Sequence, residues 1–181
     1  MSQLSFKIIV LGLLLGFMNN LWALNQKIID VYALNQDSQT NGIGESIGTI
    51  AFEDTSSGLA MVIKLKGLKP GEHGMHIHQN PSCEAQLKEG VLIPGLAAGG
   101  HLDPKQTEKH SGPFGEGHLG DLPRITADES GTVDQVVIVP RLTIYLTQNH
   151  AIVIHDGGDN YSDEPLPLGG GGPRVACGVI K

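Results

Sequence analysis

Apolar and polar side chains alternate along most of this chain, the period of a β-strand with one buried face. Between residues 59 and 66, Leu, Met, Ile and Leu alternate with Ala, Val, Lys and Lys. Turn signals such as Asn-Gly, Ser-Gly and Pro-Gly separate the segments. The pattern predicts an all-β fold, an eight-stranded antiparallel Greek-key sandwich or flattened barrel, with strands at residues 26–34, 45–53, 59–65, 72–79, 122–127, 132–139, 150–155 and 174–180.

Two long stretches, residues 80–121 and 156–173, lack this alternation. Loops longer than about 12–15 residues in a compact domain are usually functional or disordered. The first stretch carries three of the eight histidines and one of the two cysteines, so we expect ordered, functional loops.

The composition narrows the class of protein. The chain has 25 glycines and 10 prolines among 181 residues, and only 17% of its residues are charged. A coiled coil, a helical bundle and a disordered chain are poor fits to these values. The net charge is −7, whereas nucleic-acid binders carry an excess of basic residues, so no nucleic-acid partner is expected.

The first 23 residues have the pattern of a secretory signal. Lys7 precedes an apolar run at residues 8–17, which is shorter than the roughly 17–25 residues of a membrane span. We expect cleavage after Ala23, export to the periplasm, and one domain at residues 24–181 with a net charge of −8 and no membrane attachment. The alternative is an uncleaved N-terminal anchor.

Export changes the reading of the two cysteines. In an oxidising compartment Cys83 and Cys177 are the only available pair, and a disulfide is the default. Two separate buried thiols are the alternative.

The histidines carry the candidate chemistry. His76 and His78 lie two apart on an expected strand, so both imidazoles share a face and can chelate one metal; a pair of surface histidines is the alternative. His155 ends another strand, where a third imidazole could join them, and such a site suits copper. The first loop adds three imidazoles and one carboxylate, the donors of a four-coordinate zinc shell: His101, His110, His118 and Asp121. A chance cluster is the alternative.

Five stretches resemble the Cu/Zn superoxide dismutases of the bacterial exported (periplasmic) type, in the family's order and across essentially the whole expected domain. They read GEHGMHIH (71–78), AGGHLDP (98–104), GHLGDLP (117–123), HDGGDNYSD (155–163) and LGGGGPRVACGVI (168–180). Two departures are Met75, where the family usually has phenylalanine, and Pro173, where a small residue is commoner. Neither removes a ligand.

The resemblance implies one copper and one zinc per subunit. Copper would bind His76, His78, His101 and His155, and zinc would bind His101, His110, His118 and Asp121. His101 would bridge the two ions and supply a proton, and Asp159 would link a copper histidine to a zinc histidine. His73 and His150 have no ligand role in the pattern.

The implied activity is disproportionation of two superoxide ions to dioxygen and hydrogen peroxide by Cu(II)/Cu(I) cycling, which protects against extracytoplasmic superoxide. Arg174, anchored near the copper by the disulfide, would hold the anionic substrate, with Lys88, Lys105 and Lys109 as outer sources of attraction. The family's bacterial members occur as monomers and homodimers. The competing hypothesis is a non-catalytic exported copper- or zinc-binding buffer on the same fold.

Overall fold

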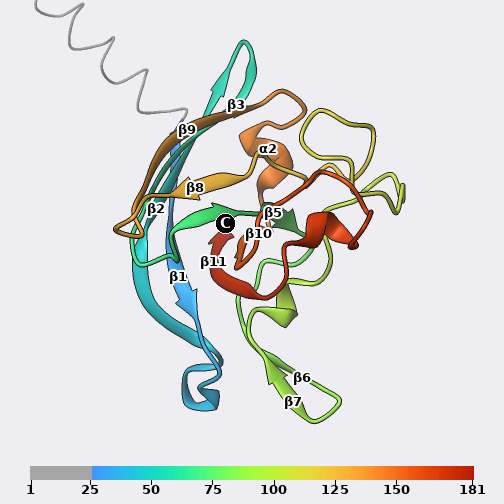
Figure 1. The fold of residues 1–181 in the computed structure, drawn as a ribbon. Coiled ribbons are helices and arrows are strands. Elements are labelled where there is room, and N and C mark those ends of the chain that lie inside the picture. Colours follow the sequence, from blue (N-terminus) through green and yellow to red (C-terminus); the bar gives the residue numbers. More distant parts are fainter. Residues whose placement is uncertain (1–25) are drawn as a thin grey trace, which may run out of the picture.

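A computed structural model of the chain describes residues 26–181 (Figure 1). The expected signal at residues 1–23 lies outside the described part. Strands dominate, and the helical elements are single turns: Ser38–Thr40, Leu96–Ala98, α2 (Ile144–Thr147) and Leu168–Gly170. The strands are β1 (Gln26–Leu34), β2 (Ile43–Thr55), β3 (Gly58–Leu65), β4 (Gly71–His73), β5 (Met75–His78), β6 (Gln86–Lys88), β7 (Val91–Ile93), β8 (Ile125–Ala127), β9 (Val133–Val139), β10 (His150–His155) and β11 (Arg174–Ile180).

Seven strands form one antiparallel sheet in the order β5-β10-β11-β1-β2-β3-β9. The sheet curls until its ends approach each other (Figure 1). β4 runs into β5 at one edge, β8 leads into β9 at the other, and β4 pairs with β8. The result is the flattened antiparallel barrel expected from the sequence.

The core follows the alternation of the strands. In β3 the four inward residues Leu59, Met61, Ile63 and Leu65 are at most 1% exposed. Neighbouring strands contribute Phe52, Ile77, Ile152 and other buried side chains to the same cluster. The barrel interior is therefore apolar, and polar chemistry is confined to the outside of the sheet and the loops.

The structure corrects three strand predictions. The segment 72–79 is two strands, because the backbone leaves the ladder at Gly74 and β4 and β5 pair with different partners. The segment 122–127 is ordered as a strand only over β8. The first long loop also contains a hairpin, β6–β7, where the sequence predicts only loop, because two strands of three residues are too short to show an alternation. The described residues thus form eleven strands rather than eight.

Cys83 and Cys177 form the expected disulfide, which ties the first long loop to β11. The two sulfurs lie in a small second cluster of buried residues with Ala98, Ala151 and Val153. Among residues 26–181, none of the helices has the length and apolar character needed to cross a bilayer.

Candidate metal centre

The site is built on β5, where the first long loop returns twice to the strand. His101 forms a bridge opposite His78, and Asp121 forms one opposite His76. The Ile77 carbonyl accepts from the Leu102 amide, and the Ile77 amide donates to the Gly120 carbonyl at 2.9 Å. A Cβ on Gly120 would lie 2.2 Å from the Ile77 oxygen, so only glycine permits this approach. These backbone contacts bring two segments of the first long loop, around His101 and around Asp121, to the strand that carries His76 and His78.

Four imidazoles face one another in the first cluster, and one ring nitrogen of each lies within 4.8 Å of the others. All four residues are buried, and none of the four facing nitrogens has a hydrogen-bond partner. An unpaired buried polar atom is costly, and four in one place call for an explanation. The atoms are His76 Nδ1, His78 Nε2, His101 Nε2 and His155 Nε2.

The opposite ring nitrogens of this cluster are all engaged. His76 Nε2 donates to Asp159 Oδ2 at 2.8 Å, His78 Nδ1 to the Gly99 carbonyl at 2.9 Å, and His155 Nδ1 to the Gly172 carbonyl at 3.0 Å. A carboxylate or carbonyl oxygen can only accept, so the ring nitrogen beside it must carry the proton of the neutral imidazole. The other ring nitrogen then presents its lone pair to the cluster centre.

The second cluster gathers around one carboxylate oxygen. Asp121 Oδ1 lies 3.0 Å from His101 Nδ1, 3.0 Å from His110 Nδ1 and 3.3 Å from His118 Nδ1. His110 Nδ1 is not in line for a hydrogen bond there and is the fifth unpaired buried ring nitrogen. Asp121 Oδ2 accepts from the Ser111 amide, which sets the carboxylate orientation. His101 belongs to both clusters, with Nε2 in the first and Nδ1 in the second.

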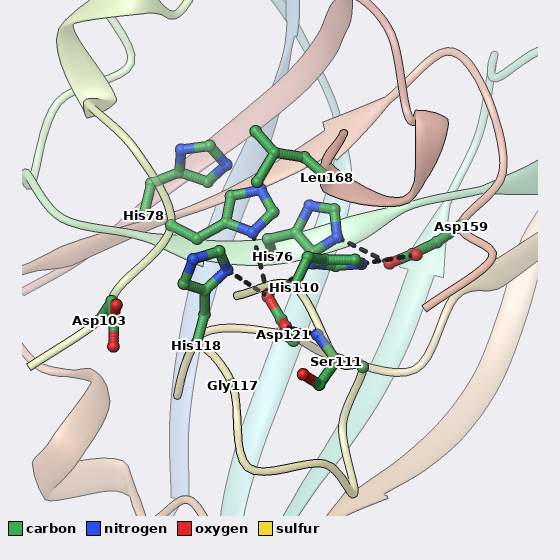
Figure 2. A network of polar contacts seen from close by, with 12 residues as sticks. His76, His78, Asp103, His110, Ser111, Gly117, His118, Asp121, Asp159 and Leu168 are labelled. Atoms are coloured by element: carbon green, nitrogen blue, oxygen red, sulfur yellow. Dashed lines mark hydrogen bonds and ion pairs between the residues drawn. The ribbon is translucent and has the colours of Figure 1, made fainter. Parts of the chain in front are cut away.

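Asp159 joins the two clusters on their other side. One oxygen accepts from His76 Nε2, and the other accepts from His110 Nε2 at 2.7 Å and from the Tyr161 amide at 2.7 Å. Figure 2 shows Asp159 at the edge of the imidazole group and Asp121 below it. Both carboxylates are at most 4% exposed, so they stay ionised only because several donors surround them.

Burial sets the proton state of most of the imidazoles. It lowers the pKa of His76 to about 3 and that of His155 to about 4, which keeps both neutral at pH 7. His110 differs: burial lowers its pKa, but the negative charges of Asp121 and Asp159, together with the hydrogen bond that His110 Nε2 donates to Asp159, outweigh burial and raise the pKa to about 9. Burial opposes ionisation of Asp121, yet its histidine partners hold the pKa of that carboxyl well below its usual range.

Arg174 lies at the start of β11, three residues before the disulfide cysteine. Its Nη1 donates to the Gly95 carbonyl and its Nη2 to the Gly99 carbonyl at 2.6 Å. The Gly99 oxygen also accepts from His78, so one carbonyl joins the guanidinium to the first cluster. Arg174 adds its charge to the burial that lowers the pKa values of His78 and His155.

The chain matches the family model described as copper/zinc superoxide dismutase (SODC) over residues 46–180. It is 52% identical to "Superoxide dismutase [Cu-Zn] 2" of Salmonella typhimurium over 141 residues, which cover 77% of this chain and 82% of that protein. The Escherichia coli K12 "Superoxide dismutase [Cu-Zn]" is 50% identical over 143 residues, covering 78% and 83%.

This chain belongs to the copper/zinc superoxide dismutase family. Among solved structures, the Cu/Zn superoxide dismutase from Brucella abortus superposes with a TM-score of 0.82 at 43% identity, covering 86% of this chain and 99% of that one. The Salmonella enterica enzyme, described as monomeric, gives a TM-score of 0.75 at 47% identity, with the same coverage. The fold and the resemblance found in the sequence agree with these comparisons.

The residues present fit the metals of the copper/zinc superoxide dismutase family. The first cluster offers four imidazole lone pairs that no protein group satisfies, a donor set that suits copper. The second offers three imidazoles and one carboxylate, the donor set of a closed zinc site. Ligation would relieve the cost of the unpaired buried nitrogens.

The structure also places the remaining histidines and lysines. His73 is buried, with its two ring nitrogens 2.6 Å from the His155 carbonyl and 2.8 Å from the Lys69 carbonyl, which leaves neither free for a metal. His150 contacts the Gln79 carbonyl away from both clusters. The three expected steering residues are all exposed: Lys88, Lys105 and Lys109.

Sequence reasoning gave no role to two residues that support the site. Asp163 accepts from the His110 amide and, with its other oxygen, from the Leu168 amide, so it joins the two long loops. Arg124 donates to the Asp159 carbonyl. Both contacts involve main-chain atoms far away in sequence, and no local pattern in the chain signals them.

Proposed function

We propose that this protein is a superoxide dismutase that converts two superoxide ions and two protons into dioxygen and hydrogen peroxide. The observation that carries the proposal is the set of four unpaired imidazole nitrogens next to a half-buried arginine. A cluster of this kind binds a redox metal, and the adjacent guanidinium suits a small anion.

His76, His78, His101 and His155 would hold copper, and His101, His110, His118 and Asp121 would hold zinc. When bound, copper supplies one-electron redox chemistry between Cu(II) and Cu(I), whereas zinc supplies fixed charge and order without changing its oxidation state.

His101 has the arrangement needed to handle a proton. Its Nδ1 stays 3.0 Å from Asp121 Oδ1, while its Nε2 faces the first cluster. Nε2 is therefore the atom at which the chain can hold a proton and pass it to the peroxide product. Asp121, as a fellow member of the zinc ligand set, would keep the ring oriented during the transfer.

Arg174 would bind superoxide at the cluster. The carbonyls of Gly95 and Gly99 hold two of its nitrogens, so the guanidinium is fixed in place before the substrate arrives. Prior ordering of a binding group lowers the entropy lost when the anion docks. The net charge of −8 expected for residues 24–181 repels superoxide at long range, so attraction has to come from this local charge and the exposed lysines of the first loop.

Residues 1–23 would direct the chain to the periplasm and be removed after Ala23, leaving residues 24–181 as the enzyme. The N-terminal sequence of the exported protein tests this cleavage. The sequence is compatible with a monomer and with a homodimer, which sedimentation equilibrium distinguishes, and the Salmonella enterica relative is described as monomeric.

The decisive experiment combines metal analysis with the rate of superoxide consumption in Arg174→Glu and in single lysine variants. We expect Arg174→Glu to lose roughly 10- to 100-fold in the second-order rate at unchanged copper content, the worth of one charged hydrogen bond. Screening acts over about 8 Å at physiological ionic strength, so the lysine deficits should vanish as salt is raised while the arginine deficit persists.

Two results would count against the function as proposed. An Arg174→Glu protein that consumes superoxide at the parental rate in low and high salt would show that Arg174 does not bind the substrate. A parent protein that binds one copper and one zinc without consuming superoxide would instead identify a metal buffer.

A further inference from the structure

Arg124 links three parts of the structure just outside the metal centre. It follows the end of the first long loop and precedes β8. Its Nε donates to Glu72 Oε1 at 2.9 Å, and its Nη1 donates to the Asp159 carbonyl at 3.1 Å. Its Cζ lies 5.2 Å from the Tyr161 ring centroid, and its own amide donates to the Tyr161 hydroxyl at 3.0 Å. The planar guanidinium fork contacts Glu72, the Asp159 carbonyl and the Tyr161 ring at the same time.

The strand side of this contact is fixed by the fold. β4 and β8 pair in register, with His73 opposite Ile125 and Glu72 opposite Thr126. Glu72 therefore lies in β4, and Arg124 lies directly before its partner strand β8. The guanidinium connects that sheet to the backbone of the second long loop, which has no ladder of its own there.

The loop side of the contact is the backbone of Asp159. The Asp159 carboxylate must reach His76 with one oxygen and His110 with the other, at 2.8 and 2.7 Å. Charge-assisted hydrogen bonds of this length weaken sharply when the carboxylate turns or retreats. The Arg124–Asp159 contact fixes the main chain from which the carboxylate reaches inward.

We propose that Arg124 is a positioning residue that holds Asp159 against His76 and His110 and so slows the release of zinc. The inference rests on the proposed function, because it takes the second cluster as the zinc site. A shallow, solvent-open hollow of about 400 Å³ adjoins this contact, lined by Glu72, Arg124, Gly158, Asp159 and Leu166 among others. It gives the loop space to move outward when the arginine no longer holds it.

The role is separable from global stability. The Arg124 and Glu72 side chains are 38% and 53% exposed, and an ion pair this exposed contributes little to the free energy of unfolding. Removing the guanidinium should therefore leave unfolding of the metal-free chain nearly unchanged. A change in metal release would then arise from positioning of Asp159.

The test compares Arg124→Met with Glu72→Gln, which loses the charge of the pair but keeps an oxygen to accept from Arg124. Release of zinc from the fully loaded proteins is followed with a chromogenic chelator, and cobalt placed in the zinc site reports its ligand geometry by visible absorption. Partners of metal-bound histidines alter affinity about 10- to 100-fold, and Arg124 acts one contact further out. We expect about 3- to 10-fold faster release and a changed cobalt spectrum in Arg124→Met, and nearly parental behaviour in Glu72→Gln.

Arg124→Lys sharpens the comparison, because it keeps the positive charge but lacks the fork of donors. We expect it to release zinc as fast as Arg124→Met. The proposal is overturned if Arg124→Met releases zinc at the parental rate, or if its metal-free Tm falls by more than about 4 °C, which in a domain of this size would indicate a loss of global stability. Asp121→Ala, run in parallel, separates the two hypotheses: parental release there would overturn the zinc assignment itself.

Discussion

Gly169 contacts the carboxylate that joins the two clusters, and replacing it with alanine should displace that carboxylate. A Cβ at Gly169 would lie 2.0 Å from Asp159 Oδ1 and 2.9 Å from His110 Nε2. Ordinary contacts are about 3.5 Å, so Asp159 Oδ1 would have to retreat by roughly 1.5 Å. It would then lose its hydrogen bonds to His110 Nε2 and the Tyr161 amide, both 2.7 Å long.

The cost can be estimated from these contacts. Two hydrogen bonds to a charged group are worth about 3–6 kcal/mol together. The positive φ of 70° at Gly169 adds about 1–2 kcal/mol of backbone strain for alanine. Gly170 offers the matched control, because its φ is 74° and a Cβ there would meet Leu166 only at 3.7 Å. Gly170→Ala should carry the strain alone, which leaves a difference of about 3–6 kcal/mol between the variants.

The assay is urea unfolding of both metal-free variants and the parent, with zinc release from the loaded proteins as the second measurement. We expect the Gly169→Ala midpoint to fall well below that of Gly170→Ala, and its zinc to dissociate faster. Equal midpoints and equal zinc release in the two variants would refute the argument that Gly169 leaves room for the Asp159 carboxylate.

Three further predictions concern other parts of the structure. Asp121→Ala should lose zinc and thermal stability but keep copper and part of the activity; unchanged zinc content by metal analysis would contradict the assignment. Cys83→Ala should destabilise the chain by about 4–5 kcal/mol in urea, since the bond to Cys177 closes a loop of 94 residues in sequence separation. The metal-free protein should lose stability as pH falls from about 6.5 toward 4, by about 1 kcal/mol per pH unit for each of two imidazoles. Burial holds the pKa values of His76 and His155 at about 3 and 4, so the unfolded chain binds those protons at a higher pH than the folded chain does. A calorimetric Tm that is flat over this range would contradict the prediction.

The barrel could be predicted because its strands have one buried and one exposed face. Alternation in residues 59–65 identified the four inward side chains of β3 directly. The same rule placed His76 and His78 together, since residues two apart on a strand share a face. The break between β4 and β5 was missed, because Gly74 interrupts the ladder without interrupting the alternation.

The loop residues of the site followed from composition and family resemblance rather than from periodicity. His101 and Asp121 reach β5 through two isolated bridges, and such contacts leave no repeating pattern in the sequence. Asp163 and Arg124 act on main-chain atoms more than 30 residues away. A carbonyl or amide partner carries no residue type, so one sequence cannot reveal these contacts.

The two clusters are connected by two separate routes, and this explains why several residues outside the ligand sets matter. His101 contributes one ring nitrogen to each cluster, and the Asp159 carboxylate joins His76 of the first to His110 of the second. Displacement of a ligand in one cluster therefore changes the orientation of an imidazole in the other. The Gly169 backbone and the Arg124 guanidinium both set the position of Asp159. They therefore act on both clusters, although neither belongs to a ligand set.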